Sequence, residues 1–146
     1  MTQCCTIYCK TKNLKEIARL IHQQFPGCSS DDLADEWDSI VVHGREGNLR
    51  FTSKWFHQGG DDFCRLLLST IAFVEGIPNV DPVMKTYLTS HVESCELVLG
   101  VVATPSLDAD TRYHAVVFLI AKELGGIVFN GEEMLDANGQ RLVGTD

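Results

Sequence analysis

The sequence predicts a single α+β domain in which one order of elements (strand, helix, strand, strand) occurs twice. The order is found over about residues 4–56 and again over about 95–143, with a helical connection over 61–92, and 146 residues is the length of one domain. We therefore expect one domain over 1–146, built from two βαββ-like halves of ferredoxin-like character with two extra helices between them. We expect a mixed or antiparallel sheet with helices mainly on one face. The copies agree in pattern and not in residues, so duplication is left open.

The first half begins with an alternating segment over residues 4–10, which predicts a strand. Asn13 follows as the N-cap of a helix, and Glu16 completes a variant of the capping box. Pro26-Gly27 ends this helix, and the acidic stretch 29–36 predicts a loop or at most a helical turn. The apolar side chains of the helix form a single stripe, consisting of Leu14, Ile17, Ile21 and Phe25.

The next two strands predict a β-hairpin whose register follows from its turn. Arg45-Glu46-Gly47 has the composition of a three-residue loop with glycine at the left-handed position, which aligns strands over 37–44 and 48–55. Val41 then faces Phe51 on an apolar side, and an opposite-charge pair lies on the other side. A slip of one residue would exchange the two faces.

Two helices are predicted between the halves. The first begins at Asp61 or Asp62 and ends near Gly76. The second has Asp81 as its N-cap and Pro82 at the first helical position, where a backbone N–H has no helical partner to lose. We expect one apolar stripe of this helix to face the core, formed by Met84, Tyr87, Leu88 and His91 with Val92 at its margin.

The second half begins with a nearly continuous apolar segment over 96–103, which is typical of a strand at the centre of a sheet. A helix is expected over about 109–124, with Asp108 as its N-cap and Gly125-Gly126 at its end. Asn138-Gly139 is the strongest short signal for a tight hairpin turn. The remaining predicted strands are 127–130, 134–137 and 140–143.

The chain is acidic and has an ordinary globular composition. It contains 12 Lys and Arg against 20 Asp and Glu, which gives a formal net charge of −8, and 45% of its residues are hydrophobic. This composition excludes the disordered and fibrous classes. An acidic surface repels phosphate backbones and anionic lipids, so we expect no nucleic acid and no membrane partner, whereas a basic protein partner is permitted.

We expect a cytoplasmic protein. The chain opens without the basic and apolar regions of a secretory signal. Its longest apolar runs, 97–103 and 115–121, are far shorter than the ~20 residues of a membrane-spanning helix. In a reducing compartment we expect free thiols. The cysteines concerned are Cys4, Cys5, Cys9, Cys28, Cys64 and Cys95.

The main candidate for a catalytic or ligand-binding site lies at the open end of the predicted hairpin. The register places His57 opposite Asp35, just beyond a pair formed by Trp37 and Trp55. A carboxylate beside an imidazole raises its basicity and fixes its tautomer, as a general base requires, and two tryptophans would form the walls of a ligand pocket. No nucleophile accompanies the pair, and an Asp–His pair at a hairpin end is commonly structural, so both interpretations stay open.

The cysteines near the N-terminus offer a weaker hypothesis. Zinc sites use four ligands, usually in short pairs on turns, whereas Cys4 and Cys5 are adjacent and would point to opposite faces of a strand. No second pair of ligands stands near Cys9 in the sequence. We therefore expect core thiols, no metal and no cofactor, and keep a thiol-based metal or redox protein as a third hypothesis.

The leading functional hypothesis is a non-catalytic cytoplasmic protein that binds another protein, because no catalytic motif is found and the chain is small and acidic. The partner is either a second copy of the chain or a basic protein, and the latter includes an inhibitor or immunity-type role. The alternative is a small enzyme or small-molecule-binding protein with its pocket near Trp37, Trp55, His57 and Asp35.

Overall fold

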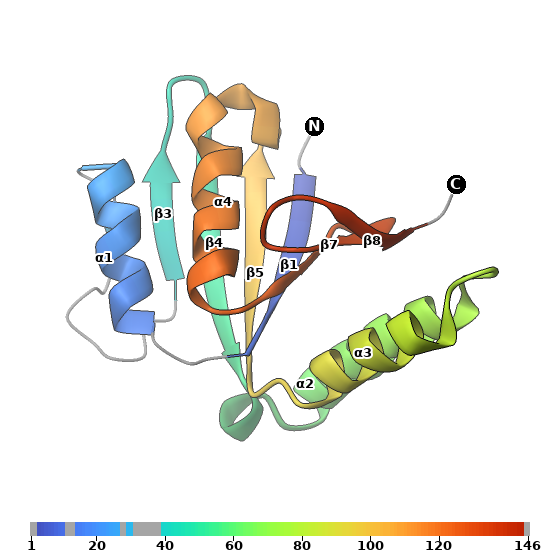
Figure 1. Ribbon diagram of the computed structural model, residues 1–146. Helices are drawn as coiled ribbons and strands as arrows, with labels where there is room; N and C mark the ends of the chain where they lie inside the picture. The colour runs from blue at the N-terminus through green and yellow to red at the C-terminus, as the bar shows by residue number, and fades with distance from the viewer. Residues whose placement is uncertain (1–2, 11–13, 27–28, 31–38, 145–146) are drawn as a thin grey trace.

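One antiparallel sheet and the helices around it form the regular structure of the chain (Figure 1). The computed structural model describes residues 3–10, 14–26, 29–30 and 39–144. The strands are β1 (Gln3–Cys9), β2 (Ser29–Ser30), β3 (Ser39–His43), β4 (Asn48–Trp55), β5 (Leu97–Thr104), β6 (Ile127–Phe129), β7 (Glu133–Leu135) and β8 (Arg141–Gly144). The helices are α1 (Leu14–Gln24), α2 (Phe56–Gly76), α3 (Pro82–Glu93) and α4 (Thr111–Glu123), with a short 3-10 helix η1 over Leu107–Ala109. None of these helices is long and apolar enough to cross a membrane.

The strands are ordered β2-β3-β4-β5-β1-β6-β7-β8, and each neighbouring pair is antiparallel. The two central strands are β5 and β1, with Leu99 opposite Ile7. The apolar segment predicted to be a central strand is therefore confirmed, and Leu97, Val98 and Leu99 are fully buried because both faces are covered there. The chain forms a single α+β domain, as predicted, and the sheet is antiparallel and not mixed.

Helices cover both faces of the sheet, which corrects the expectation that they lie mainly on one face. On one face, Ile21 of α1 and Ile120 of α4 belong to the same buried cluster as Ile7 of β1. On the other face, Leu88 of α3 shares a second buried cluster with Tyr8, the next residue of β1. Figure 1 shows α4 in front of the sheet, α1 beside β3 at the left, and the α2–α3 hairpin below β7 and β8. Consecutive apolar residues in the central strands make a second helical layer necessary.

Polar contacts also fix the α2–α3 hairpin to β1. The hydroxyl of Tyr8 is hydrogen-bonded to the hydroxyl of Thr70 on α2, and both side chains are buried. The Nε2 of His91 on α3 lies 2.8 Å from the carbonyl oxygen of Tyr8, to which the ring N–H donates. Buried polar groups require such partners, so these contacts define where the hairpin sits on the sheet.

The β3–β4 hairpin has a register one residue away from the predicted one. Phe51 is paired with Ile40 and not with Val41. The buried side of the hairpin therefore carries Ile40 and Val42, whereas Val41 is only half-buried on the opposite side. The prediction of a half-buried hairpin is confirmed. The face of β3 that was predicted to point into the core is wrong, because the register is shifted by one residue.

The loop of this hairpin explains the shift. The backbone N–H of Gly44 donates to the carbonyl oxygen of Gly47 at 2.9 Å, and His43 and Asn48 form the first strand pair beyond the loop. A Cβ atom on Gly47 would lie 1.9 Å from the carbonyl oxygen of Thr104 at the end of β5. Glycine is required here because the loop approaches another strand closely, and not because of a left-handed turn.

Helix α2 begins earlier than predicted. Its first turn starts at Phe56, directly after β4, and Gly60 interrupts it with φ of 52° and ψ of −128°. The predicted start at Asp61 or Asp62 therefore corresponds to the longer, second part of the helix. Glycine suits this interruption, because φ in that range strains any residue with a side chain.

Helix α4 begins later than predicted. Asp108 lies in η1, and the N-cap of α4 is Asp110, whose carboxylate accepts a hydrogen bond from the backbone N–H of Arg112 at 3.0 Å. The guanidinium of Arg112 donates to the same carboxylate at 2.7 Å. These bonds to Arg112 hold the pKa of Asp110 well below its usual range.

Candidate docking surface and adjoining cavities

The residues of the predicted catalytic pair lie outside what the structure describes. Asp35 and Trp37 fall in the segment 31–38, and the side chain of His57 is not described, although its backbone belongs to the first turn of α2. The pairing of Asp35 with His57 and the facing tryptophans therefore stay predictions. The shifted register of β3 and β4 removes the alignment from which they were derived.

Trp55 is the one member of that set whose side chain is described. It is the last residue of β4, is buried, and pairs with Leu97 of β5. It lines a cavity of about 710 Å³ where β4 turns into α2. This Trp55 cavity is lined by Ser53, Lys54, Trp55, Asp62, Phe63, Arg65, Leu66 and Ser69.

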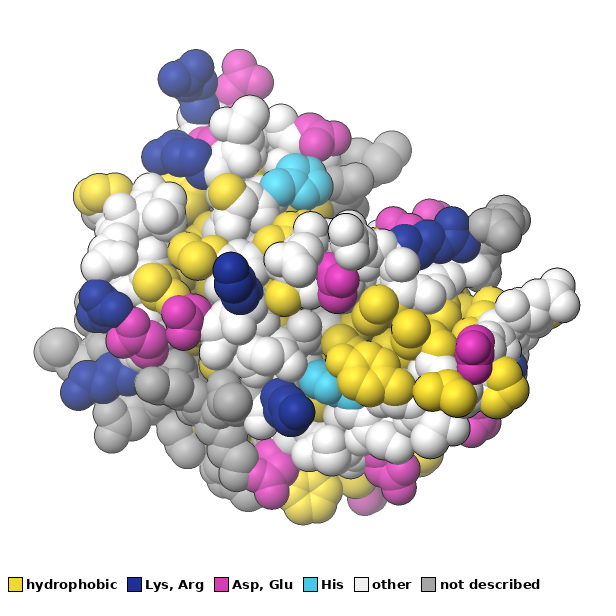
Figure 2. Space-filling view, viewed as in Figure 1, with side chains coloured by type: hydrophobic (Ala, Val, Ile, Leu, Met, Phe, Trp, Pro, Cys, Tyr) yellow, Lys and Arg dark blue, Asp and Glu magenta, His cyan; other side chains and the backbone are white. Residues whose placement is uncertain are grey.

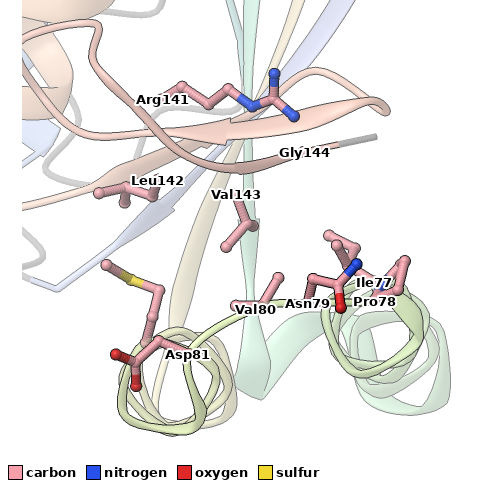
Figure 3. Close-up of a pocket in the computed structure, with 10 residues that line it drawn as sticks. Ile77, Pro78, Asn79, Val80, Asp81, Arg141, Leu142, Val143 and Gly144 are labelled. Carbon is pink, nitrogen blue, oxygen red and sulfur yellow. The ribbon is translucent and has the colours of Figure 1, made fainter. Parts of the chain in front are cut away.

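A groove of about 640 Å³ lies between β8 and the loop that joins α2 to α3 (Figure 3). Figure 3 shows Val143 of β8 directed toward Val80 of the loop, with Asp81 and Arg141 at its margins. Asn79 turns the loop with φ of 62°, in the left-handed region that asparagine tolerates better than most residues. The lining of this α3–β8 groove is Ile77, Pro78, Asn79, Val80, Asp81, Met84, Arg141, Leu142, Val143 and Gly144.

The N-terminal half of α3 presents exposed apolar side chains next to this groove. Val83 is 77% exposed and Tyr87 is 53% exposed, although Tyr87 was predicted to face the core. Only Leu88 and Val92 of this helix are buried. Figure 2 shows hydrophobic side chains gathered at the lower right of the molecule, where Figure 1 places α3 and β8. We call Pro82, Val83, Met84 and Tyr87 the α3 surface.

The sequence contained a signal for this exposure. Apolar or aromatic side chains at 83, 84, 87, 88 and 92 occupy more of the helix circumference than one core-facing stripe needs. A helix that packs on one side of a domain buries only part of such a set. The remainder is expected on the surface, and Val83 and Tyr87 are that remainder.

Acidic groups lie along the α2–α3 hairpin that carries the α3 surface. Glu75, Asp81 and Glu93 are exposed, and no ion pair involves them within the described part of the chain. Two cations near this surface, Lys85 and Arg141, each contact a neighbouring residue. The ammonium of Lys85 donates to the carbonyl oxygen of Glu75 at 3.1 Å, and Arg141 Nε lies 3.9 Å from Glu133 Oε2.

The cysteines of β1 do not converge. Cys4 is exposed, whereas Cys5 and Cys9 are buried in the cluster beneath α1 and α4. Burial raises the pKa of the Cys5 thiol to about 12 and raises the pKa of Cys9 further, so both are protonated at neutral pH. Cys64 on α2 is exposed. In the described ranges no three His, Cys, Asp or Glu side chains are arranged to hold a metal ion.

A smaller cleft of about 380 Å³ lies between β1, η1 and the first turn of α4. His114 Nε2 lies 3.1 Å from Asp108 Oδ1 at its rim, and Cys4 and Cys5 contribute to its lining. Both side chains of this Asp–His pair are exposed, and that of Asp108 is 85% exposed. With the Cys5 thiol protonated, this cleft offers no activated nucleophile from that residue.

Comparison of the chain with protein families, with curated proteins and with solved structures finds no match.

Proposed function

We propose that this protein is a non-catalytic binding protein that docks a basic protein partner on the α3 surface and in the α3–β8 groove. The observation that carries the proposal is the exposure of large apolar side chains beside an apolar groove, with Val83 at 77% and Tyr87 at 53%. Exposed apolar surface with a polar rim is typical of a protein docking site.

The shape of this region suits an inserted side chain. The α3–β8 groove has a volume of about 640 Å³, and a shallower depression of about 460 Å³ lies on the other side of the same helix turn, beside Val83 and Tyr87. Tyrosine and methionine are enriched at the centres of protein interfaces, and Tyr87 and Met84 supply both here. A partner that fills the groove would bury the apolar surface on both sides of α3.

The charge of the rim favours a basic partner over a second copy. Glu75 and Asp81 supply carboxylates beside the surface and Glu93 supplies one at the far end of α3, whereas Lys85 keeps its positive charge and Arg141 is ion-paired with Glu133. The whole chain carries −8. Two copies would bring equal acidic rims together, which electrostatic repulsion opposes, whereas a basic partner would be steered to this face.

The proposal is tested with a fluorescein-labelled amphipathic peptide of leucine and lysine, whose binding is followed by fluorescence anisotropy. We expect Val83→Ser to weaken binding by about tenfold, because the substitution removes an apolar contact at the centre of the surface. Leu68→Ser is the matched control. Leu68 is 64% exposed on α2, outside the α3 surface and the groove, and its replacement should leave the affinity unchanged.

A peptide of leucine and glutamate in the same order separates charge recognition from apolar adsorption. Binding of both peptides with equal affinity, or equal losses in Val83→Ser and Leu68→Ser, would contradict the proposal. Sedimentation velocity of the protein alone tests whether a second copy of the chain binds to the α3 surface. A dimer that Val83→Ser dissociates would assign the surface to a second copy and overturn the choice of a basic partner.

We also propose a ferredoxin-like character of the two halves and a cytoplasmic location. In a ferredoxin-like fold, another strand lies between the two strands that a helix connects. The central order β4-β5-β1-β6 supports this character: β1 lies between β5 and β6, and β5 lies between β1 and β4. The cytoplasmic location is supported by the described cysteines, Cys4, Cys5, Cys9, Cys64 and Cys95, all of which are free thiols.

A further inference from the structure

The Trp55 cavity has an apolar floor. Phe63 is 3% exposed and Leu66 is half-buried beside it, whereas the side chain of Trp55 belongs to the buried cluster on the other face of the sheet. Phe56 packs edge-on against Phe63, with ring centroids 5.9 Å apart, and so holds that ring in place. A floor of this kind favours a flat apolar body over water.

Lys54 provides a cation at one side of this floor. Its side chain lies over β5, since a Cβ atom on Gly100 would be 3.8 Å from Lys54 Cε and 3.9 Å from Nζ. The absence of a side chain at Gly100 leaves room for this position. Lys54 forms no ion pair within the residues that the structure describes.

Arg65 provides a second cation from α2. It faces Asp62 with Nη1 and Oδ1 separated by 3.6 Å, and the two side chains are 77% and 92% exposed. An ion pair this exposed contributes little, so the guanidinium can turn to another anion at small cost. In a chain of net charge −8, two cations beside one apolar cavity are a local exception.

We propose that the Trp55 cavity binds an organic anion with a flat apolar body, whose negative group is held by Lys54 and Arg65. The volume of about 710 Å³ lies within the range of small-molecule sites. The hydroxyl of Ser69 adds a hydrogen-bonding group to the wall formed by α2.

This site is independent of the α3 surface. The cavity lies at the start of the long part of α2, and the α3 surface lies beyond the other end of that helix, about 20 Å away at the rise of an α-helix. A ligand bound at one does not contact the other, so failure of either proposal leaves the other standing.

The test compares two fluorescent probes on the whole protein. One is anilinonaphthalene sulfonate, and the other is phenylnaphthylamine, which has the same rings without the negative group. We expect Lys54→Met, which keeps the length of the side chain, to weaken binding of the sulfonate by about fivefold while changing binding of the neutral probe less than twofold. Asp62→Asn, which removes the carboxylate that competes for Arg65, should tighten binding of the sulfonate.

Val83→Ser and Lys85→Gln serve as controls, because the first alters the other apolar surface and the second removes a cation elsewhere. Neither should change the affinity of the cavity for the sulfonate. Circular dichroism of each variant confirms the fold, and Asp62→Asn keeps the test decisive if Lys54→Met does not fold. Equal binding of the two probes, or loss of sulfonate binding in Val83→Ser but not in Lys54→Met, would overturn the proposal.

Discussion

Helices α3 and α4 have similar lengths and pack on opposite faces of the same sheet, but they use their apolar residues differently. On α4, five residues are buried, including Tyr113, which is fully enclosed. On α3 only Leu88 and Val92 are buried, and the tyrosine of that helix, Tyr87, is 53% exposed.

Buried and exposed apolar side chains are expected to contribute differently to the stability of the fold and to the proposed binding. The apolar residues of α4 contribute to folding because folding removes them from water. Val83 and Tyr87 contribute little to folding, since they remain exposed, and the proposed docking of a basic partner would bury them. The comparison predicts that changes on α4 and on the inner side of α3 alter stability, whereas changes on the outer side of α3 alter binding alone.

The largest effect is expected when a buried side chain of either helix is truncated. Ile120→Ala on α4 and Leu88→Ala on α3 each remove a fully buried side chain, and each should lower the free energy of unfolding by about 2–5 kcal/mol. Urea denaturation followed by circular dichroism measures both. A cost below about 1 kcal/mol for Leu88→Ala would show that α3 is not packed against the sheet as described.

The next effect concerns the polar contact that attaches α2 to β1. Thr70→Val leaves the buried hydroxyl of Tyr8 without its hydrogen bond and should cost about 1–3 kcal/mol. The double variant with Tyr8→Phe removes both hydroxyls and should recover part of that loss. A double-mutant cycle of unfolding free energies measures the coupling, and additive losses would exclude the hydrogen bond as an anchor.

A smaller effect is expected at the start of α4. Asp110→Ala removes the N-cap and should cost about 1 kcal/mol, whereas Asp108→Ala, at the cap position predicted from the sequence, should cost less. Because Arg112 lowers the pKa of Asp110, the ionic part of this stability is fully present above the ordinary value of 3.8 and is lost as pH falls toward the lowered pKa.

The variant Asp110→Asn isolates that ionic part, because asparagine still caps the helix but cannot ionise. The difference in unfolding free energy between the natural protein and Asp110→Asn should be largest near neutral pH and should shrink below pH 3.8. A difference that is constant across this range would contradict the role given to Arg112.

The smallest effect on stability is expected on the outer side of α3. Val83→Ser and Tyr87→Ala should each change the free energy of unfolding by less than about 0.5 kcal/mol, because both side chains are exposed. Tyr113→Ala on α4 is the matched comparison, and its cost should be several kcal/mol, about 3–5 for a buried aromatic side chain. Similar losses for Tyr87→Ala and Tyr113→Ala would remove the distinction between the two helices.

Local signals in the sequence predicted local features correctly. Ile17, Ile21 and Phe25 are buried as one stripe of α1. Asp81 caps α3 and accepts a hydrogen bond from the N–H of Val83 at 2.8 Å. Gly139 has a left-handed φ of 82°, as its turn position suggests, although the loop between β7 and β8 spans 136–140 and is longer than the predicted tight turn. Each of these depends on residues within one or two turns of the chain, so neighbouring sequence is sufficient.

Features that depend on distant residues were not predictable in this way. The register of β3 depends on the four-residue loop over 44–47, whose Gly47 lies against Thr104, a residue far away in sequence. The exposure of Tyr87 follows from where Tyr8 and Thr70 place the α2–α3 hairpin on the sheet. Lys54 and Arg65 line the Trp55 cavity from two different elements, β4 and α2, and Gly60 interrupts the first turn of α2 between them.

The most direct test of the central claim is a nuclear magnetic resonance titration of the protein with the leucine–lysine peptide. The account predicts that the largest shifts in the backbone amide signals fall on α3 near Val83 and Tyr87 and on the groove residues Val80 and Val143, with α4 unaffected. Shifts concentrated on α1 and α4, or spread evenly over the acidic surface, would contradict the claim that the exposed side of α3 is the docking site.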